Sequence, residues 1–245
     1  MIIRTLLRIC TAALAVIGAS GHGYLSEPVS RNLAHGNNYC PQCLNMGGSW
    51  STFGGGADRQ TACGDPWTSP RPRPHERGGQ FGDAPAHKLQ PGGTLWATVQ
   101  FTANHLGRWG LQICDSGAED LGCFRTLERE DGRGAWVQVP PESMSFRAEF
   151  SLPADLRACE RCTLRWVYWT GNSCTPAGTP PGPWRNDALD TCFANPWTIP
   201  EMFANCANVR IESSKAGPEG KPCAHPGWKR PKRGKKCVPQ PKNRG

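Results

Sequence analysis

Two histidines in the sequence have the chemistry to hold a metal ion together. Arg4 and Arg8 flank the start of an apolar run, residues 9–17, and Ala19 and Gly21 supply the small residues that a signal peptidase needs. Cleavage after Gly21 leaves His22 as the first residue of the mature chain. A terminal histidine offers a free α-amine and an imidazole, which together chelate a metal at little additional entropic cost.

A third nitrogen donor is expected from His105. This residue lies in a turn between two alternating segments, 95–101 and 109–113, where a rigid scaffold can present a side chain. Three nitrogen donors in a planar arrangement match the tetragonal preference of Cu(II). A histidine in such a turn is more often a solvated surface residue, so the case for His105 depends on its pairing with His22. The weaker candidates are His35, His75, His87 and His225.

The elements expected to position these residues are short strands. Apolar and polar residues alternate in 95–101, 109–113 and 146–152, and further β-rich segments are 135–139, 163–169 and 207–212. Residues 22–93 show no sustained period and predict a long loop region, and the 29 Gly and 23 Pro argue against a helix bundle. The sequence therefore predicts an all-β fold, an immunoglobulin/fibronectin III-like antiparallel β-sandwich with long disulfide-braced loops.

Cysteine usage indicates export. The chain has 13 cysteines, and removal of residues 1–21 with Cys10 leaves an even number, enough for six bridges. Their pairing stays open apart from an expected Cys223–Cys237 bridge. The Cys40/Cys43 and Cys159/Cys162 pairs could suggest zinc, but over a hundred residues separate them and export favours disulfides. A thioredoxin-like redox role would need a pair that opens a helix after a strand, which neither context offers. We expect a secreted, extracellular protein.

The charge is divided unevenly along the chain. The formal net charge is +8, but residues 215–245 alone carry 10 Lys and Arg against one acidic residue. Because the basic residues crowd into a Pro/Gly/Lys-rich end and not onto a folded face, nucleic-acid binding is disfavoured. No apolar run is long enough to cross a membrane. We expect a signal peptide at 1–21, one domain at 22–214 and a basic tail at 215–245, either solvated or in contact with acidic polysaccharide or a cell surface.

Several short motifs follow one another in the predicted domain. They are the mature start His22-Gly-Tyr-Leu-Ser-Glu-Pro-Val-Ser-Arg31, the pieces Cys63-Gly-Asp-Pro-Trp67 and Glu76-Arg-Gly-Gly79, Thr102-Ala-Asn-His105-Leu-Gly, Leu164-Arg-Trp-Val-Tyr-Trp-Thr-Gly-Asn172-Ser, and Phe203-Ala-Asn-Cys-Ala-Asn208-Val-Arg-Ile211. In this order they resemble the lytic polysaccharide monooxygenases of the chitin-binding type-4 group, most like auxiliary activity family fifteen. The resemblance covers about residues 22–212 and not the tail.

The resemblance implies a histidine brace around one copper ion, Cu(II)/Cu(I), held by the His22 α-amine, His22 Nδ1 and His105 Nε2. Phe203 matches the position that packs on the axial side of the copper, where a phenylalanine cannot ligate. Glu76 is the candidate for a nearby carboxylate that hydrogen-bonds the oxygen co-substrate. Asn208 stands where many relatives have an acidic residue, which we expect to affect local hydrogen bonding.

The activity implied by the resemblance is oxidative cleavage of glycosidic bonds in an insoluble polysaccharide, with chitin favoured over cellulose. It uses an external electron donor with oxygen or hydrogen peroxide as co-substrate, and the enzyme is expected to be a monomer. The candidates for stacking on sugar faces are Tyr39, Trp50, Phe53 and Trp67. Two alternatives stay open: a non-catalytic polysaccharide-binding protein of the same fold, and a cystine-rich extracellular adhesion protein.

Overall fold

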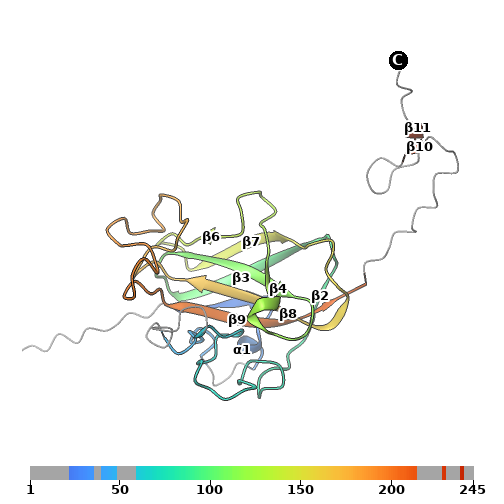
Figure 1. Cartoon of the computed structure of the whole chain (residues 1–245), viewed down its shortest axis with the longest axis horizontal. Coiled ribbons are helices and arrows are strands. Elements are labelled where there is room, and N and C mark those ends of the chain that lie inside the picture. Colours follow the sequence, from blue (N-terminus) through green and yellow to red (C-terminus); the bar gives the residue numbers. More distant parts are fainter. Residues whose placement is uncertain (1–21, 36–39, 49–58, 214–227, 230–237, 240–245) are drawn as a thin grey trace, which may run out of the picture.

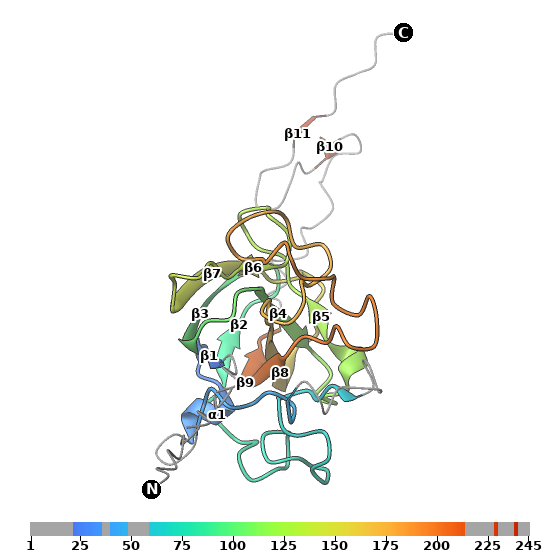
Figure 2. The same cartoon turned by 90° about the vertical axis from the view of Figure 1, so that its left-hand side faces the viewer.

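Two β-sheets packed face to face form the body of the protein (Figures 1 and 2). The structure is a computed structural model that describes residues 22–35, 40–48 and 59–213, with two further strand segments, β10 (Trp228–Lys229) and β11 (Val238–Pro239). One sheet has the order β1-β3-β7. The other follows β2-β9-β8-β4-β5, with β6 also paired to β4. No helix in the described ranges is both long and apolar enough to cross a membrane.

The strand bounds are as follows. The three-stranded sheet contains β1 (His22–Glu27), β3 (Thr94–Ala103) and β7 (Ser145–Ser151). The six-stranded sheet contains β2 (His87–Leu89), β4 (Arg108–Cys114), β5 (Arg125–Thr126), β6 (Val137–Gln138), β8 (Cys159–Trp169) and β9 (Met202–Ile211). A short helix α1 (Arg31–Ala34) and a 3-10 turn η2 (Leu121–Cys123) are the helical elements in these ranges.

The apolar residues of the alternating sequence pattern lie on the strand face that fills the core. On β3 the side chains of Leu95, Ala97, Val99 and Phe101 are buried, while the residues between them turn outward. Phe101 packs edge-on against Tyr168 of β8, with ring centroids 4.7 Å apart. The predicted sandwich is therefore confirmed, and its core lies between β3 and β8.

Two predictions about elements were wrong. Residues 22–93 contain β1, α1 and β2 as well as loops, and β2 pairs with β9 in parallel, so the six-stranded sheet is mixed. The strand expected at 207–212 is β9, and it already begins at Met202. The sequence pattern missed this start because the first six residues of β9 are all buried, on both faces of the strand. Loops from the first part of the chain cover the outer face of that sheet (Figure 2), which hides the alternation.

Five disulfides connect the described cysteines. They are Cys40–Cys43, Cys63–Cys206, Cys114–Cys123, Cys159–Cys162 and Cys174–Cys192. Both C-x-x-C pairs are disulfides, so they do not hold zinc in this form of the chain. Neither pair opens a helix after a strand, as a thioredoxin-like motif does, since Cys159 and Cys162 lie in β8 and Cys40 and Cys43 lie in a turn. The Cys63–Cys206 bridge fixes the early loop to β9 across 143 residues. The expected Cys223–Cys237 bridge lies outside the described residues.

A buried charge network attaches α1 to the six-stranded sheet. The Arg31 guanidinium is fully buried and donates to Glu119, to Asn208 Oδ1 and to the His75 carbonyl oxygen at 2.8 Å. Glu119 also accepts from the Thr163 hydroxyl and the Arg77 amide. Burial opposes ionisation of Glu119, but the hydrogen bond and charge of Arg31 outweigh it, and the pKa of Glu119 lies below its usual range.

Replacing Glu119 by Ala should destabilise the fold by about 3–5 kcal/mol near neutral pH, because it leaves the Arg31 charge buried without its counter-ion. Since the pKa of Glu119 is lowered on folding, its stabilisation is present above the ordinary carboxyl value of 4.5 and is lost as the pH falls below it. Urea unfolding between pH 7 and pH 3 measures both effects. The control is Glu160→Ala, which removes an exposed pair with Arg210 and should cost about 0–1 kcal/mol. Equal losses in the two variants would contradict the prediction.

Candidate metal centre

The register of β1 on β3 places His22 at one end of the sandwich. His22 pairs with Ala103, and His105 follows two residues later, just beyond the end of β3. Gly23 pairs with Phe101, and glycine is required there because a Cβ at this position would lie 2.7 Å from Cδ1 of Phe101. The Leu25 amide also donates to Asn205 Oδ1 at 2.9 Å, which fixes β1 to β9. The predicted N-terminus therefore lies beside the predicted histidine turn.

The turn that carries His105 is held from both sides. The Tyr168 hydroxyl donates to the Leu106 carbonyl oxygen at 2.7 Å and accepts from the His105 amide at 3.3 Å. The His105 carbonyl oxygen accepts from the Gly171 amide at 2.8 Å. Gly107 has a φ of +85°, and a Cβ there would lie 2.1 Å from the Trp169 carbonyl oxygen. The backbone of His105 is therefore fixed by β8 and by the residues that follow it.

One ring nitrogen of His105 is already engaged. The side-chain amide of Asn172 lies against His105 Nδ1, with its nitrogen 2.7 Å away. When this amide is turned so that Oδ1 accepts from Nδ1–H, Nε2 carries no proton and is the nitrogen that can bind a metal. The residue as a whole is only 9% exposed. Burial, and then the neighbouring His22, lower the pKa of His105. A neutral imidazole at neutral pH is the form that binds a metal.

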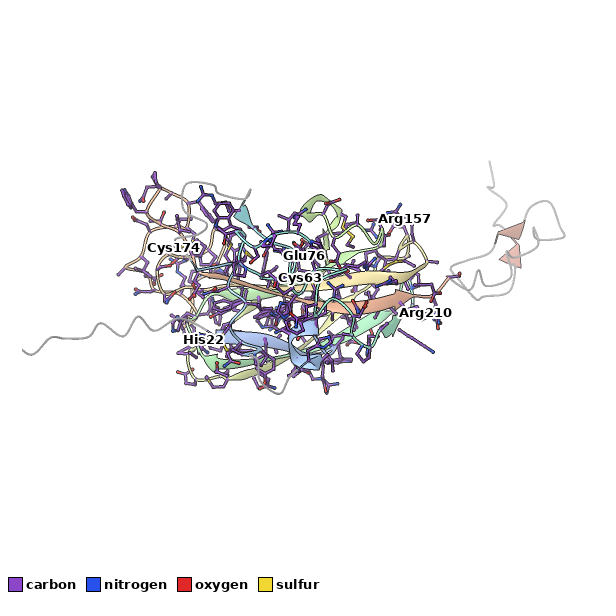
Figure 3. The ribbon with its side chains drawn as sticks, turned by 90° about the horizontal axis from the view of Figure 1, so that it is seen from below. His22, Cys63, Glu76, Arg157, Cys174 and Arg210 are labelled. Carbon is purple, nitrogen blue, oxygen red and sulfur yellow. A yellow bond between two sulfur atoms is a disulfide. The ribbon has the colours of Figure 1, made fainter. Side chains whose placement is uncertain are left out.

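Phe203 completes the group of residues brought together here. Its ring is fully buried and lies 6.2 Å from the His22 ring, measured between centroids. It also packs against Tyr168, with centroids 5.9 Å apart. The structure thus assembles His22, His105 and Phe203 from β1, the β3–β4 turn and β9. Figure 3 shows His22 at the end of the molecule where this site lies.

The side chains brought together here supply two nitrogen donors, the imidazoles of His22 and His105. A third donor for a metal ion has to come from the backbone. Among the residues that the structure describes, no group of three His, Cys, Asp or Glu side chains is arranged to hold a metal ion. Two imidazoles are present, and imidazole is a suitable ligand for copper, zinc or iron. A terminal amine at His22 would provide the third donor. These residues therefore fit copper in the chain processed at position 22.

Glu76 is not brought to this group. Its carboxylate accepts from the Arg73 amide and from Arg73 Nη1, the latter at 2.7 Å, and Arg71 Nε lies 3.9 Å away. Figure 3 shows Glu76 away from His22, toward the middle of the molecule. The Glu76-Arg-Gly-Gly79 segment instead forms part of the loop that covers the six-stranded sheet. The reason is local, since Arg73 lies three residues away and captures the carboxylate.

Asn208 takes part in the buried charge network and not in the metal site. Its side-chain oxygen accepts from Arg31 Nε at 2.9 Å and from Nη2 at 2.7 Å, and its amide nitrogen donates to the Ala84 carbonyl oxygen. Glu119 supplies the negative charge beside Arg31. Asn208 therefore acts through local hydrogen bonds, as expected from the sequence.

Three residues at this site were missed in the sequence. Tyr168 and Asn172 position His105, and Glu201 stands two residues before Phe203. The Glu201 carbonyl oxygen accepts from the Thr170 amide at 3.1 Å, next to the Gly171 amide that bonds His105. Its carboxylate accepts from Asn45 Nδ2 at 2.8 Å. A carboxylate directly before a buried strand was the available signal, but only strand pairing shows that it lies near His105.

The expected sugar contacts are largely outside the described residues. Tyr39, Trp50 and Phe53 all fall there. Trp67 is half-buried, its amide donates to the Met46 carbonyl oxygen, and the Arg59 guanidinium lies 4.6 Å from the centre of its ring. Trp67 therefore has packing partners within the loop itself.

Comparisons with known proteins agree with the geometry. Residues 22–209 match the family model described as "Lytic polysaccharide mono-oxygenase, cellulose-degrading", and the match begins at His22. Among solved structures, the chain is similar to "Lytic Polysaccharide Monooxygenase AA15 from Thermobia domestica in the Cu(I) State". The TM-score is 0.60 and the identity 25%, with 78% of this chain and 99% of the other covered. No curated protein matches the chain.

Asn172→Ala should weaken copper binding by the mature chain about 10- to 100-fold, because His105 loses the group that orients its ring. Asn172→Asp should bind nearly as tightly as the wild type, since a carboxylate oxygen accepts from Nδ1–H while Nε2 faces the metal. Isothermal titration with copper and electron paramagnetic resonance measure the affinity and the ligand field. The control is Asn186→Ala, an exposed asparagine further along the same loop. Unchanged affinity in Asn172→Ala would contradict the prediction.

Proposed function

The chain belongs to the lytic polysaccharide mono-oxygenases and is a copper-dependent monooxygenase, and we propose that it is secreted and cleaves glycosidic bonds in insoluble polysaccharide oxidatively. The observation that carries the proposal is the meeting of His22, His105 and Phe203 at one end of the sandwich. Chitin is the favoured substrate over cellulose, although the family description names cellulose. An external electron donor and oxygen or hydrogen peroxide complete the reaction.

Some of these residues would bind the metal directly, and others would hold the ligands in position. In the processed chain, the His22 α-amine and Nδ1 and the His105 Nε2 would be the three ligands. Copper bound by them supplies one-electron redox chemistry at the exposed end of a sandwich. Asn172 fixes the ring of His105, and Tyr168 fixes its backbone. The Phe203 ring, which has no donor atom, keeps water and a further ligand from its side of the site.

A carboxylate near the site is needed to place or accept a proton on the oxygen co-substrate. We assign this task to Glu201 instead of Glu76. Glu201 adjoins the residues that bond His105, and its charge acts on the buried Tyr168 hydroxyl. Burial, aided by this negative charge, raises the pKa of Tyr168, so the phenol keeps its proton and continues to hold the turn.

The proposed location of the site suits a solid substrate. His22 begins β1 and His105 lies in the turn between β3 and β4, so both lie at one end of the sandwich. Hydrolases need a chain placed between two carboxylates, whereas a metal at an exposed end can reach chains that are still packed in a solid. We take residues 1–21 as the signal peptide, 22–214 as the catalytic domain and 215–245 as a basic tail that contacts acidic polysaccharide or a cell surface. The protein is proposed to act as a monomer.

The mature chain beginning at His22 should bind one copper ion tightly. A form with one additional residue before His22 should bind about 100-fold or more weakly, because the chelating amine has become an amide. His105→Ala should lose affinity to a similar degree. His87→Ala provides the matched control, since this histidine is exposed on β2 and should leave binding unchanged. Equal affinity in the processed and extended forms would show that no brace forms.

Mass spectrometry of the soluble products is the direct test of activity. Mature, copper-loaded protein incubated with a reductant and with β-chitin or microcrystalline cellulose should release oxidised oligosaccharides, more from chitin than from cellulose. The same incubation without reductant should release none. Retention on chitin with tight copper binding but no oxidised product would identify the non-catalytic binding protein instead. A mature N-terminus other than His22 would favour the adhesion protein.

A further inference from the structure

The long loop between β8 and β9, residues 170–201, carries two exposed aromatic side chains close together in the sequence. Trp197 is 74% exposed and Phe193 is 46% exposed, and Trp197 is the most exposed large hydrophobic residue in the described part of the chain. Single exposed apolar side chains are common on protein surfaces. Two within five residues, on one loop tip, require a more specific explanation.

The tip that carries them, residues 193–198, is held in one conformation by its own hydrogen bonds. The Phe193 amide donates to the Thr198 carbonyl oxygen at 2.7 Å, and the Trp197 amide donates to Asn195 Oδ1 at 2.9 Å. The Asn195 amide donates to the Thr198 hydroxyl at 3.1 Å. The Cys174–Cys192 disulfide closes the loop immediately before the tip. The exposed indole is therefore presented on a fixed backbone, which reduces the entropy lost on binding.

Phe193 adopts an unusual backbone conformation to take its place in this tip. Its φ is +65°, a region that bulky residues seldom occupy. Its ring packs edge-on against Trp169 at the end of β8, with centroids 5.9 Å apart. Such conformations cost free energy and persist where the surrounding structure enforces them, most often at functional sites.

The tip lies at the same end of the molecule as the metal site. The Ser173 hydroxyl donates to the Ile199 carbonyl oxygen at 3.0 Å, which joins the residue after Asn172 to the residue two after Trp197. Asn172 itself contacts His105, and Gly171 bonds the His105 carbonyl oxygen. Figure 3 shows Cys174 and His22 at the same end of the molecule, and Figure 1 shows the 170–201 loop (orange) gathered there.

The chemistry of the tip indicates what it binds. Residues 193–198 are Phe-Ala-Asn-Pro-Trp-Thr and contain no charged side chain. A flat indole offers a large apolar surface to the C–H face of a pyranose ring, and the neighbouring amide and hydroxyl groups suit its hydroxyls. An uncharged polysaccharide chain matches this surface better than an acidic one does.

We propose that Trp197, supported by Phe193, is a polysaccharide-stacking residue that holds a neutral glycan chain beside the metal site. The inference rests on the proposed function for the nature of the substrate, but it assigns the contact to the 170–201 loop and not to the early loop. It predicts that affinity for the solid substrate and affinity for copper are separable. Removing Trp197 should reduce the first and leave the second unchanged.

The experiment compares variants of the mature, copper-loaded protein in binding isotherms on β-chitin and on microcrystalline cellulose. Trp197→Ala should raise the dissociation constant on the preferred solid about tenfold, as expected for a central aromatic contact. Trp197→Tyr should retain most of the affinity. The matched control is Trp96→Ala, which removes an exposed tryptophan on β3, roughly 23 Å along the strand from Ala103. Copper titration on each variant checks that the fold and the metal site are intact.

The outcomes distinguish the two proposals. Wild-type affinity in Trp197→Ala, or an equal loss in Trp96→Ala, would overturn the role of Trp197. Unchanged glycan binding combined with a shift in the sedimentation of Trp197→Ala would instead identify the tip as a contact between copies of the chain, and would also overturn it. A wild-type protein that binds the solid through Trp197 but releases no oxidised product would refute the proposed function and leave the stacking role standing. No glycan binding by the wild type refutes both.

Discussion

The antiparallel register of β1 on β3 is the constraint on which the rest of the site depends. It sets His22 opposite Ala103, so the first residue of the strand lies beside the turn that carries His105. A shift of this register by one residue would turn the His22 side chain to the other face of the strand. The contact between Gly23 and Phe101 and the Leu25–Asn205 hydrogen bond oppose such a shift. The position of His22 beside the turn of His105 is thus a consequence of backbone pairing.

Strand β8 links the hydrophobic core to the turn that carries His105. It pairs with β4 on one side and β9 on the other, and its Tyr168 contacts both Phe101 in the core and Phe203 beside the site. The same hydroxyl bonds the turn of His105. A buried phenol needs partners for its polar group, and the turn supplies them. Core packing and ligand placement are therefore performed by one side chain.

The loops on the six-stranded sheet are held by a different kind of interaction. Arg31 and Glu119 are both buried, and their pairing with Asn208 and Thr163 fixes the segment after β1 to β8 and β9. The Cys63–Cys206 bridge ties a second point of the covering loop to β9. These contacts hold the segments that cover the six-stranded sheet, whereas His22 and His105 are held by the pairing of β1 with β3 and by Tyr168.

The sequence by itself indicated the β-sandwich, the disulfide chemistry of the cysteines and the pair His22 and His105, because alternation, residue composition and ligand types are local properties. It also predicts the export signal at residues 1–21. It also indicated Phe203 through resemblance to a family. Only the tertiary structure decided that Arg73 captures Glu76, that Asn172 meets the ring of His105, and that Glu201 adjoins the site. It likewise decided that β1 and β2 are strands and that the 170–201 loop, with the exposed Trp197, lies at the same end of the molecule as His22. These are contacts between residues far apart in the chain, and strand pairing, which no local pattern encodes, brings them together.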